Sequence, residues 1–513
     1  MSPGRLSAAP SRTALAVLAV MLLWLAGTAW MRPLSLPDEG RYVGVAWEML
    51  RSGDWLTPTL DGQPFFHKPP LFYWITAASL SVFGLHEWAG RVASLIGACA
   101  AAIAIALFMR RWRGWPAARA SLLVLLTQPV FFIGAQFANL DMLVAGCISA
   151  TIVLLAHVAL CADEGRAAPA ALHVAYLAAA SGVLAKGLIG VLIPAMVIGA
   201  WLLLTRRLTR VRALASVSGL ALLLVVALPW FVAMQLRHAE FLHYFIVVQH
   251  FQRYATSGFN NAQPFWFFPA ALLVLGLPWT PWLLAWRSRA PAADAPQRSI
   301  RLLMLVWTLV VVGFFSLPQS KLIGYVLPAV PPLAVLITEA LPRLDPRGWR
   351  ACAIVAVLLC LGGVTAVAMA PLPSARPLAQ ALLAQRQAGE PVIFAGGYFY
   401  DLPFYARLDR PVAVVEDWHD ASIGQRDNWR KELLDASRFA ADGGTPVLAD
   451  ASRLDPGPCA AVSTWVVATA AAAARYGLAE RARPVARSGD AGLWRIAPPA
   501  VTAPECRGKP SVD

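Results

Sequence analysis

Apolar runs of about 17 to 23 residues, long enough to cross a bilayer as helices, recur along this chain from near residue 13 to residue 371. The chain has 513 residues, of which 58% are hydrophobic and only 14% charged. These values exclude a single soluble core and predict a polytopic membrane protein. We expect eleven spans, with a range of 11–13, near residues 13–31, 91–109, 116–134, 142–160, 170–186, 188–205, 212–233, 264–286, 301–317, 322–340 and 350–371.

Arginines gather in alternate loops between these runs. The clusters are Arg5 and Arg12; Arg110, Arg111 and Arg113; Arg206, Arg207, Arg210 and Arg212; Arg287, Arg289 and Arg298; and Arg343, Arg347 and Arg350. Basic loops stay on the cytoplasmic side of a membrane. The pattern therefore predicts a multi-pass membrane protein with a cytoplasmic N-terminus, and it accounts for the net charge of +14 without nucleic acid.

One apolar segment, residues 69–84, is short and would invert every later loop if it crossed the membrane. We interpret it as an interfacial helix. Residues 32–90 then form a first periplasmic loop with juxtamembrane helices, and residues 1–371 form one transmembrane domain. An odd number of crossings places the following segment, residues 372–513, in the periplasm.

The predicted topology places several polar residues together at the outer surface of the membrane that the chain spans. Asp38 and Glu39 follow the first span directly, and acids held at a membrane rim point to function. The other members of this outer group are His67, Lys68, Asp141, Lys186, His250, Arg253 and Lys321. Cations can hold phosphate oxygens while a carboxylate handles a proton or developing charge. The group is therefore typical of chemistry on a lipid phosphate.

Most members of the group also have a structural alternative. Asp141 in NLDML is equally suited to cap a helix. Lys186 and Lys321 lie at span ends, where lysines often extend to the lipid headgroups. His250 lies in a polar loop, where it is more often a surface residue. Asp38 and Glu39 have the weakest structural explanation.

The segment after residue 371 changes in character. The runs PVIFAGG, RPVAVVED, TPVLAD and TWVVAT indicate short strands, and residues 425–441 indicate a helix. We expect a small periplasmic α/β domain. It contains no glycine-rich nucleotide loop, so no nucleotide cofactor is expected. Cys459 and Cys506 are its only cysteines, and an oxidising compartment would permit a disulfide between them.

Several motifs occur in the order and topology of a known family. They are the DE pair after the first span, GDWLTPTLDGQPFFHKPPLFYW, NLDML, LAKG, VVQHFQRY followed by QPFWFFP, and FFSLPQSKLIGYVLPAVPPLA. The chain resembles the aminoarabinose (lipid A) transferase branch of the membrane GT-C glycosyltransferases, which is similar in turn to the protein O-mannosyltransferases. The resemblance covers roughly residues 10–345.

The resemblance implies a protein of the bacterial inner membrane, a sugar donor on undecaprenyl phosphate and an acceptor at the periplasmic leaflet. Transferred position by position, it makes Asp38 the principal catalytic acid and Asp141 the second carboxylate, with Glu39 near the catalytic centre. It also implies phosphate or substrate binding by Lys68, Lys186, Arg253, Lys321 and Tyr325.

Two departures from the family pattern affect the metal and the sugar. Where the family usually has FEKP and EH, this chain has His67 before Lys68 and the pair Gln249–His250. The two imidazoles of His67 and His250 are able to ligate one divalent metal, zinc or magnesium. We expect aminoarabinose or another amino sugar, such as glucosamine, as the donor sugar.

The residues leave the acceptor and the class of function open. A lipid A phosphate is already an anion and needs no strong base, whereas a hydroxyl of a protein or another glycan would require Asp38 to take its proton. A transporter for a lipid-linked sugar would need charges in mid-span, and a non-catalytic subunit would leave the clustered acids and lysines unexplained. We therefore favour a transferase dependent on a polyprenyl-phosphate sugar.

Overall fold

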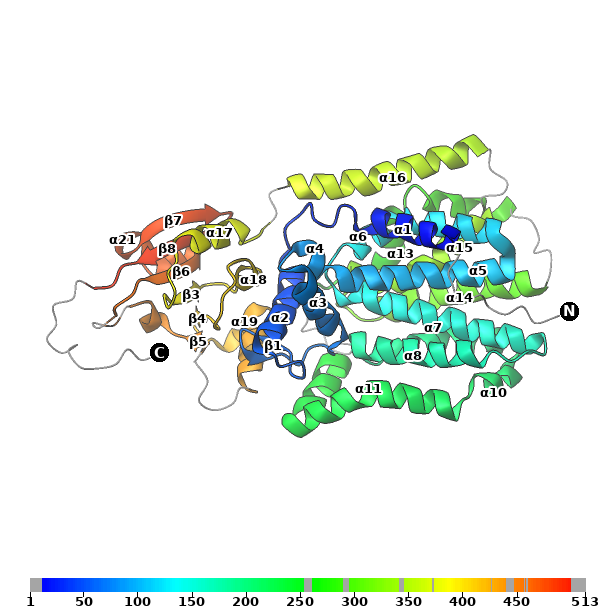
Figure 1. The fold of residues 1–513 in the computed structure, drawn as a ribbon, viewed down its shortest axis with the longest axis horizontal. Helices are drawn as coiled ribbons and strands as arrows, with labels where there is room; N and C mark the ends of the chain where they lie inside the picture. Colours follow the sequence, from blue (N-terminus) through cyan, green and yellow to red (C-terminus); the bar gives the residue numbers. More distant parts are fainter. Residues whose placement is uncertain are drawn as a thin grey trace.

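The computed structural model describes residues 12–252, 261–288, 295–340, 346–370, 373–425, 427–439, 447–455, 457 and 460–499. It has two parts, a helical bundle and a C-terminal α/β part, with α2, α3 and α4 between them (Figure 1). The predicted bundle with a small C-terminal sheet domain is confirmed. Cys459, Cys506 and Arg253 lie outside the described residues.

Most of the chain is helical. The helices of the bundle and of the loop beside it are α1 (Arg12–Ala26), α2 (Asp38–Ser52), α3 (Leu71–Phe83), α4 (Glu87–Gly90), α5 (Val92–Leu126), α6 (Pro129–Ala135), α7 (Leu140–Asp163), α8 (Pro169–Lys186), α9 (Ile189–Leu204), η1 (Leu208–Arg210), α10 (Val211–Leu214), α11 (Val217–Arg237), the π-helix η2 (His243–Gln252), α13 (Phe267–Leu275), η3 (Thr280–Ser288), α14 (Ala295–Ser316), η4 (Ile323–Ala329), α15 (Val330–Ala340) and α16 (Pro346–Met369).

Six helices among the described residues are long and apolar enough to cross a membrane. They are Val92–Leu126, Leu140–Asp163, Val217–Arg237, Pro296–Ser316, Ile323–Ala340 and Arg347–Met369. Other predicted spans coincide with shorter or less apolar helices, including α1, α8 and α9. The chain is a multi-pass membrane protein.

The predicted spans 91–109 and 116–134 meet at a sharp reversal. Gly114 has φ 82° and ψ 173°, which breaks α5 into two arms at the arginine loop. The Ser94 hydroxyl at the start of the first arm donates to the Phe137 carbonyl beyond the second arm, at 2.6 Å. The chain thus leaves one end of the bundle and returns to it.

The predicted span 264–286 is not a continuous helix. Only Phe267–Leu275 is α-helical, and a turn at Gly276 leads into the 3-10 segment Thr280–Ser288. Gly276, Pro278 and Pro281 follow this helix closely, and the two prolines lack the amide hydrogen that a continuous helix would need. A continuous crossing was therefore the wrong prediction here.

The loop after α1 folds into the predicted juxtamembrane helices. Helix α3 has only 13 residues, or about 20 Å, which is shorter than the hydrocarbon core. It packs against α2, and a hairpin of β1 (Thr59–Leu60) and β2 (Gln63–Pro64) joins them. These elements lie between the bundle and the C-terminal part (Figure 1).

The C-terminal part is built on a six-stranded sheet in the order β5-β4-β3-β6-β8-β7. The strands are β3 (Val392–Ala395), β4 (Ala413–Val415), β5 (Leu448–Ala449), β6 (Thr464–Thr469), β7 (Arg483–Ser488) and β8 (Ala491–Ile496). The helices are α17 (Arg376–Gln385), α18 (Leu402–Tyr405), η6 (Ala421–Gln425), α19 (Trp429–Ser437), η7 (Ala451–Leu454), α20 (Ala470–Arg475) and α21 (Leu478–Arg481). Strands β3 to β6 pair in parallel, and β8 runs antiparallel to β6 and β7.

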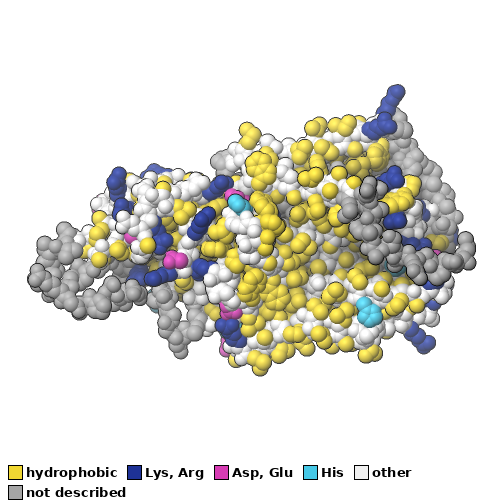
Figure 2. Space-filling model, viewed as in Figure 1, with side chains coloured by type: hydrophobic (Ala, Val, Ile, Leu, Met, Phe, Trp, Pro, Cys, Tyr) yellow, Lys and Arg dark blue, Asp and Glu magenta, His cyan; other side chains and the backbone are white. Residues whose placement is uncertain are grey.

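Hydrophobic side chains cover most of the helical part on the face seen in Figure 2, and charged side chains lie mainly toward its ends. At the bundle end away from the sheet, arginines pair with acids at the end of α7. Asp163 lies 3.1 Å from Arg207 and 2.8 Å from Arg210, and Glu164 lies 2.9 Å from Arg111. Two of the predicted arginine loops therefore meet at one end.

Candidate active site

Helix α2 presents Asp38 at its first position, directly after Pro37. A helix N-terminus favours a negative charge. The Asp38 side chain is 28% exposed, and its Oδ1 lies 3.6 Å from Nη1 of Arg41 one turn later. The Asp38 carboxyl group is thus partly exposed to solvent and lies beside a cation.

Glu39, the residue after Asp38, is wholly buried, and both of its carboxylate oxygens have partners within the protein. It forms ion pairs with Arg32 and with Arg91, whose Nε lies 2.8 Å from Oε1. The backbone amides of Ser35 and Ala138 also donate to it, at 2.9 and 2.8 Å. Burial alone would raise the pKa of Glu39, but the charges of Arg91 and Arg32 outweigh burial and lower the pKa to about 2.

These contacts give Glu39 a task different from substrate binding. They tie the start of α2 to the segment before it, to the start of α5 and to the loop before α7. Glu39 therefore fixes the position of Asp38 relative to the bundle. The predicted place of Glu39 near the catalytic centre stays a prediction.

Asp141 belongs to a cluster that joins three helical segments. Its backbone amide donates to the Asn139 side chain at 3.0 Å, so Asn139 is the cap of α7 and the capping alternative for Asp141 is wrong. The Asp141 carboxylate forms an ion pair with Lys186 at the end of α8. The Lys186 ammonium lies 4.2 Å from the centre of the Tyr325 ring. Gly324 lets the backbone approach, since a Cβ there would lie 2.0 Å from Asp141 Oδ2.

The structure therefore brings three predicted site residues, Asp141, Lys186 and Tyr325, into direct contact. The Lys186 ammonium is held by the Asp141 carboxylate and the Tyr325 ring. It therefore does not extend to the lipid headgroups, which was the structural alternative for this lysine. Tyr42 on α2 lies within electrostatic reach of both Asp38 and Asp141. Burial raises the pKa of the Tyr42 hydroxyl, and the nearby negative charges of Asp38 and Asp141 raise it further.

Lys321 is buried in the loop between α14 and η4. Its ammonium donates to the carbonyls of Gln263 and Pro318, at 2.7 and 2.5 Å, and its backbone amide donates to Asn261 at 3.0 Å. The buried ammonium thus ties two loops together instead of extending to headgroups. Its predicted contact with phosphate stays a prediction.

Lys68 follows β2 and is partly buried in the segment that leads into α3. The predicted phosphate ligand Arg253 lies outside the described residues, as does the side chain of His250. Their roles stay predictions.

His67 is buried beside the π-helix η2. Its Nε2 lies 3.0 Å from the Tyr244 hydroxyl, which also accepts from the Gln249 side chain at 3.1 Å. The His67 ring stacks on Phe65 at 4.3 Å. In the described part of the chain, no three His, Cys, Asp or Glu residues lie together in a way that could hold a metal. The other predicted ligand, the His250 side chain, lies outside the described side chains, so the metal centre at His67 and His250 stays a prediction.

Sequence reasoning missed the carboxylates that the C-terminal part supplies. Glu432 on α19 lies 3.2 Å from Arg41, and Asp435 accepts from the Tyr244 hydroxyl at 3.4 Å. The contact between Arg41 and Asp38 could have been predicted from the sequence, because residues three positions apart on a helix share one face. Nothing in the sequence around Glu432 and Asp435 indicates a link to the first loop.

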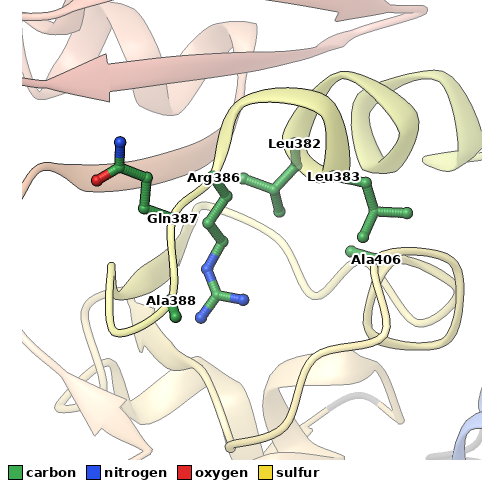
Figure 3. Close-up of a pocket in the computed structure, with 6 residues that line it drawn as sticks. All are labelled: Leu382, Leu383, Arg386, Gln387, Ala388 and Ala406. Carbon is green, nitrogen blue, oxygen red and sulfur yellow. The ribbon is translucent and has the colours of Figure 1, made fainter.

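A small cavity in the C-terminal part lies apart from this site. It has a volume of about 90 Å³ and is lined by Leu382, Leu383, Arg386, Gln387, Ala388 and Ala406 (Figure 3). Ligand pockets usually have about 300 to 1,000 Å³. The cavity is too small for a sugar-lipid substrate.

Comparison with known proteins supports the sequence resemblance. Residues 67–232 match the family model described as dolichyl-phosphate-mannose-protein mannosyltransferase. Two proteins called undecaprenyl phosphate-alpha-4-amino-4-deoxy-L-arabinose arabinosyl transferase are similar to the chain. The one from Sodalis glossinidius is 32% identical over 65% of this chain and 62% of its own length. The one from Pseudomonas aeruginosa is 33% identical over 63% of this chain and 59% of its own length.

The predicted resemblance is confirmed. A crystal structure of ArnT from Cupriavidus metallidurans bound to undecaprenyl phosphate shares the fold, with a TM-score of 0.77. It is 24% identical, and the match covers 94% of this chain and 98% of ArnT. The chain spans about three fifths of the length of the curated aminoarabinose transferases it matches.

Proposed function

We propose that the chain is a glycosyltransferase that moves an amino sugar, aminoarabinose or a close relative, from undecaprenyl phosphate to a phosphate of lipid A. The observation that carries the proposal is the grouping of Asp38, Asp141 and Lys186 around α2 and the nearby ends of α7 and α8. The names of the similar transferases support this donor, because they specify both undecaprenyl phosphate and 4-amino-4-deoxy-L-arabinose.

The proposed reaction breaks the bond between the anomeric carbon of the sugar and the phosphate oxygen of the carrier lipid. The carrier phosphate leaves as an anion, so cations that neutralise it lower the barrier. Lys68 and Arg253 are the proposed ligands of that phosphate, and Lys186 contributes positive charge while it stays paired with Asp141. Each charge-assisted contact contributes about 1.5–3 kcal/mol.

Asp38 acts on the sugar in this mechanism. Positive charge builds up on the ring as the glycosidic bond breaks, and a carboxylate beside it stabilises that charge. An acceptor phosphate attacks the anomeric carbon as an anion and needs no base. Asp38 then orients the sugar and carries no proton.

We propose that the site faces the periplasm and that the protein lies in the bacterial inner membrane. Arg111, Arg207 and Arg210 lie at the bundle end away from the sheet, where basic residues favour the cytoplasm. The N-terminus is then cytoplasmic. The sheet domain, with its proposed boundary at residues 371 and 372, lies outside.

A second acceptor class is favoured by a specific observation. The family model that matches residues 67–232 is named after transfer to protein. With a serine, threonine or glycan hydroxyl as acceptor, Asp38 would remove the hydroxyl proton as the bond to the sugar forms.

Mass spectrometry of lipid A and envelope proteins tests both acceptors. Cells that produce the chain should show lipid A that is heavier by one amino sugar, and cells that produce Asp38→Asn should not. Sugar on envelope proteins instead would establish the second acceptor. Unmodified lipid A and unmodified proteins, with the chain present in the membrane and donor available, would refute the transferase proposal.

A further inference from the structure

Helix α19 of the C-terminal part carries two buried carboxylates one turn apart. Glu432 and Asp435 are each only 5% exposed, and their spacing of three places them on one face. The helix lies beside the first-loop elements α2 and β1 in Figure 1, and it contacts β2. Neither carboxylate belongs to the motifs of the transmembrane part.

We propose that α19 is a positioning element of the active site, in which Glu432 holds the helix that bears Asp38 and Asp435 holds the segment that bears Lys68. The inference rests on the proposed function, because it assigns these two carboxylates a part in sugar transfer.

Glu432 acts through Arg41. Its Oε1 lies 3.2 Å from Arg41 Nη1, while the Tyr400 hydroxyl donates to its other oxygen. The Arg41 guanidinium also lies 5.0 Å from the centre of the Tyr400 ring and 3.6 Å from Asp38. Arg41 is thus shared between Asp38 and Glu432. Without the negative charge of Glu432, Arg41 would pair with Asp38 alone. This stronger pairing would draw the Asp38 carboxylate away from the sugar.

Asp435 acts through Tyr244 and His67. It accepts from the Tyr244 hydroxyl at 3.4 Å, and that hydroxyl lies 3.0 Å from His67 Nε2. Phe439, just after α19, packs on Tyr244 and on Phe66, with ring centres 5.2 and 4.7 Å apart. His67 directly precedes Lys68, so this chain of contacts fixes the segment that carries the proposed phosphate ligand.

The location of the Glu432 and Asp435 contacts distinguishes a positioning role for these residues from ordinary packing between domains. Glu390 is a comparably buried carboxylate whose partners among the described residues, Trp465, Arg495 and the amide of Gln387, all lie within the C-terminal part. Glu432 and Asp435 also have partners within the C-terminal part, namely Tyr400, Lys431 and Arg438. By contrast with Glu390, each has one further partner outside that part: Glu432 contacts Arg41, one turn after Asp38, and Asp435 contacts Tyr244, which contacts His67. A shift of about 1 Å at a reacting group can cost about 100-fold in rate.

Steady-state kinetics of the full chain in lipid vesicles tests the inference, with undecaprenyl-phosphate aminoarabinose as donor. Glu432→Gln should lower kcat by about 10-fold or more with donor KM nearly unchanged, because only the chemical step loses alignment. Asp435→Asn should mainly raise donor KM, by about 5-fold or more, because Lys68 is displaced. Glu390→Gln is the matched control and should change neither.

Two further readouts separate the possible failures. Tyr244→Phe should reproduce the KM effect of Asp435→Asn, and the double variant should be no worse than either single one. Binding of undecaprenyl phosphate without turnover should weaken in Asp435→Asn and not in Glu390→Gln. If the unsubstituted chain transfers no sugar, that result counts against the proposed function. The binding of undecaprenyl phosphate would then still test whether Asp435 positions the segment that carries Lys68. Kinetics of Glu432→Gln and Asp435→Asn that match Glu390→Gln in an active parent would overturn the inference.

Discussion

Replacing Glu39 with glutamine tests whether its buried ion pairs with Arg32 and Arg91 hold α2, the helix that carries Asp38, in place. On folding, the pKa of Glu39 falls from an ordinary 4.5 to about 2. One pKa unit corresponds to about 1.4 kcal/mol, so the ionised carboxylate contributes about 3 kcal/mol at neutral pH. Glu39→Gln also leaves Arg32 and Arg91 buried without their counter-charge, and breaking a buried pair costs a comparable amount, about 3–5 kcal/mol.

The sign of the pH dependence follows from the lowered pKa. The unfolded chain binds the proton more tightly than the folded chain, so protons favour unfolding. The contribution of Glu39 is fully present above pH 4.5 and is lost as the pH falls toward 2. In Glu39→Gln this part of the acid destabilisation should disappear.

Thermal unfolding of the purified protein in lipid nanodiscs, followed by tryptophan fluorescence, measures the effect at neutral and acid pH. Glu164→Gln is the matched control, because Glu164 pairs with Arg111 at 2.9 Å but is 41% exposed. An exposed pair contributes about 0.2–1 kcal/mol. The midpoint of Glu39→Gln should therefore lie well below that of the control. If the two midpoints coincide at neutral pH, the argument for a stabilising buried cluster is refuted.

Three further substitutions probe the site. Asp38→Asn should lower transfer by about 100-fold or more without changing the unfolding midpoint, and near-normal turnover would contradict its catalytic role. Lys186→Met should destabilise the protein by about 3–5 kcal/mol by leaving Asp141 buried and unpaired, and adding Asp141→Asn should restore part of the midpoint. Gly324→Ala should lower transfer by about 10-fold or more, because its Cβ would lie 2.0 Å from Asp141, whereas Gly313→Ala, with nothing within 4 Å, should retain activity.

The amino-acid sequence determined the features that arise from local pattern. Apolar run length predicted the membrane class, because burying a helix in lipid depends on residues that are contiguous in the chain. Runs of β-branched residues predicted β3, β4, β5 and β6 in the same way. Strands β7 and β8 were missed, since RPVARS and AGLWRI are polar or glycine-containing; AGLWRI becomes a strand by pairing with β6, and RPVARS by pairing with β8.

For the candidate site, the sequence predicted which polar residues gather at one membrane surface, and Asp38, Asp141 and Lys186 were singled out that way. Only the tertiary structure decided what each one does. Lys186 pairs with a carboxylate 45 positions earlier, and the acid next to Asp38 proved to be a buried tie between helices. Glu432 reaches Arg41 from another part of the fold. These partners come together only when elements that are distant in the chain pack against each other. A buried charge is stabilised by the groups around it in space, and a local sequence pattern does not show which groups those are.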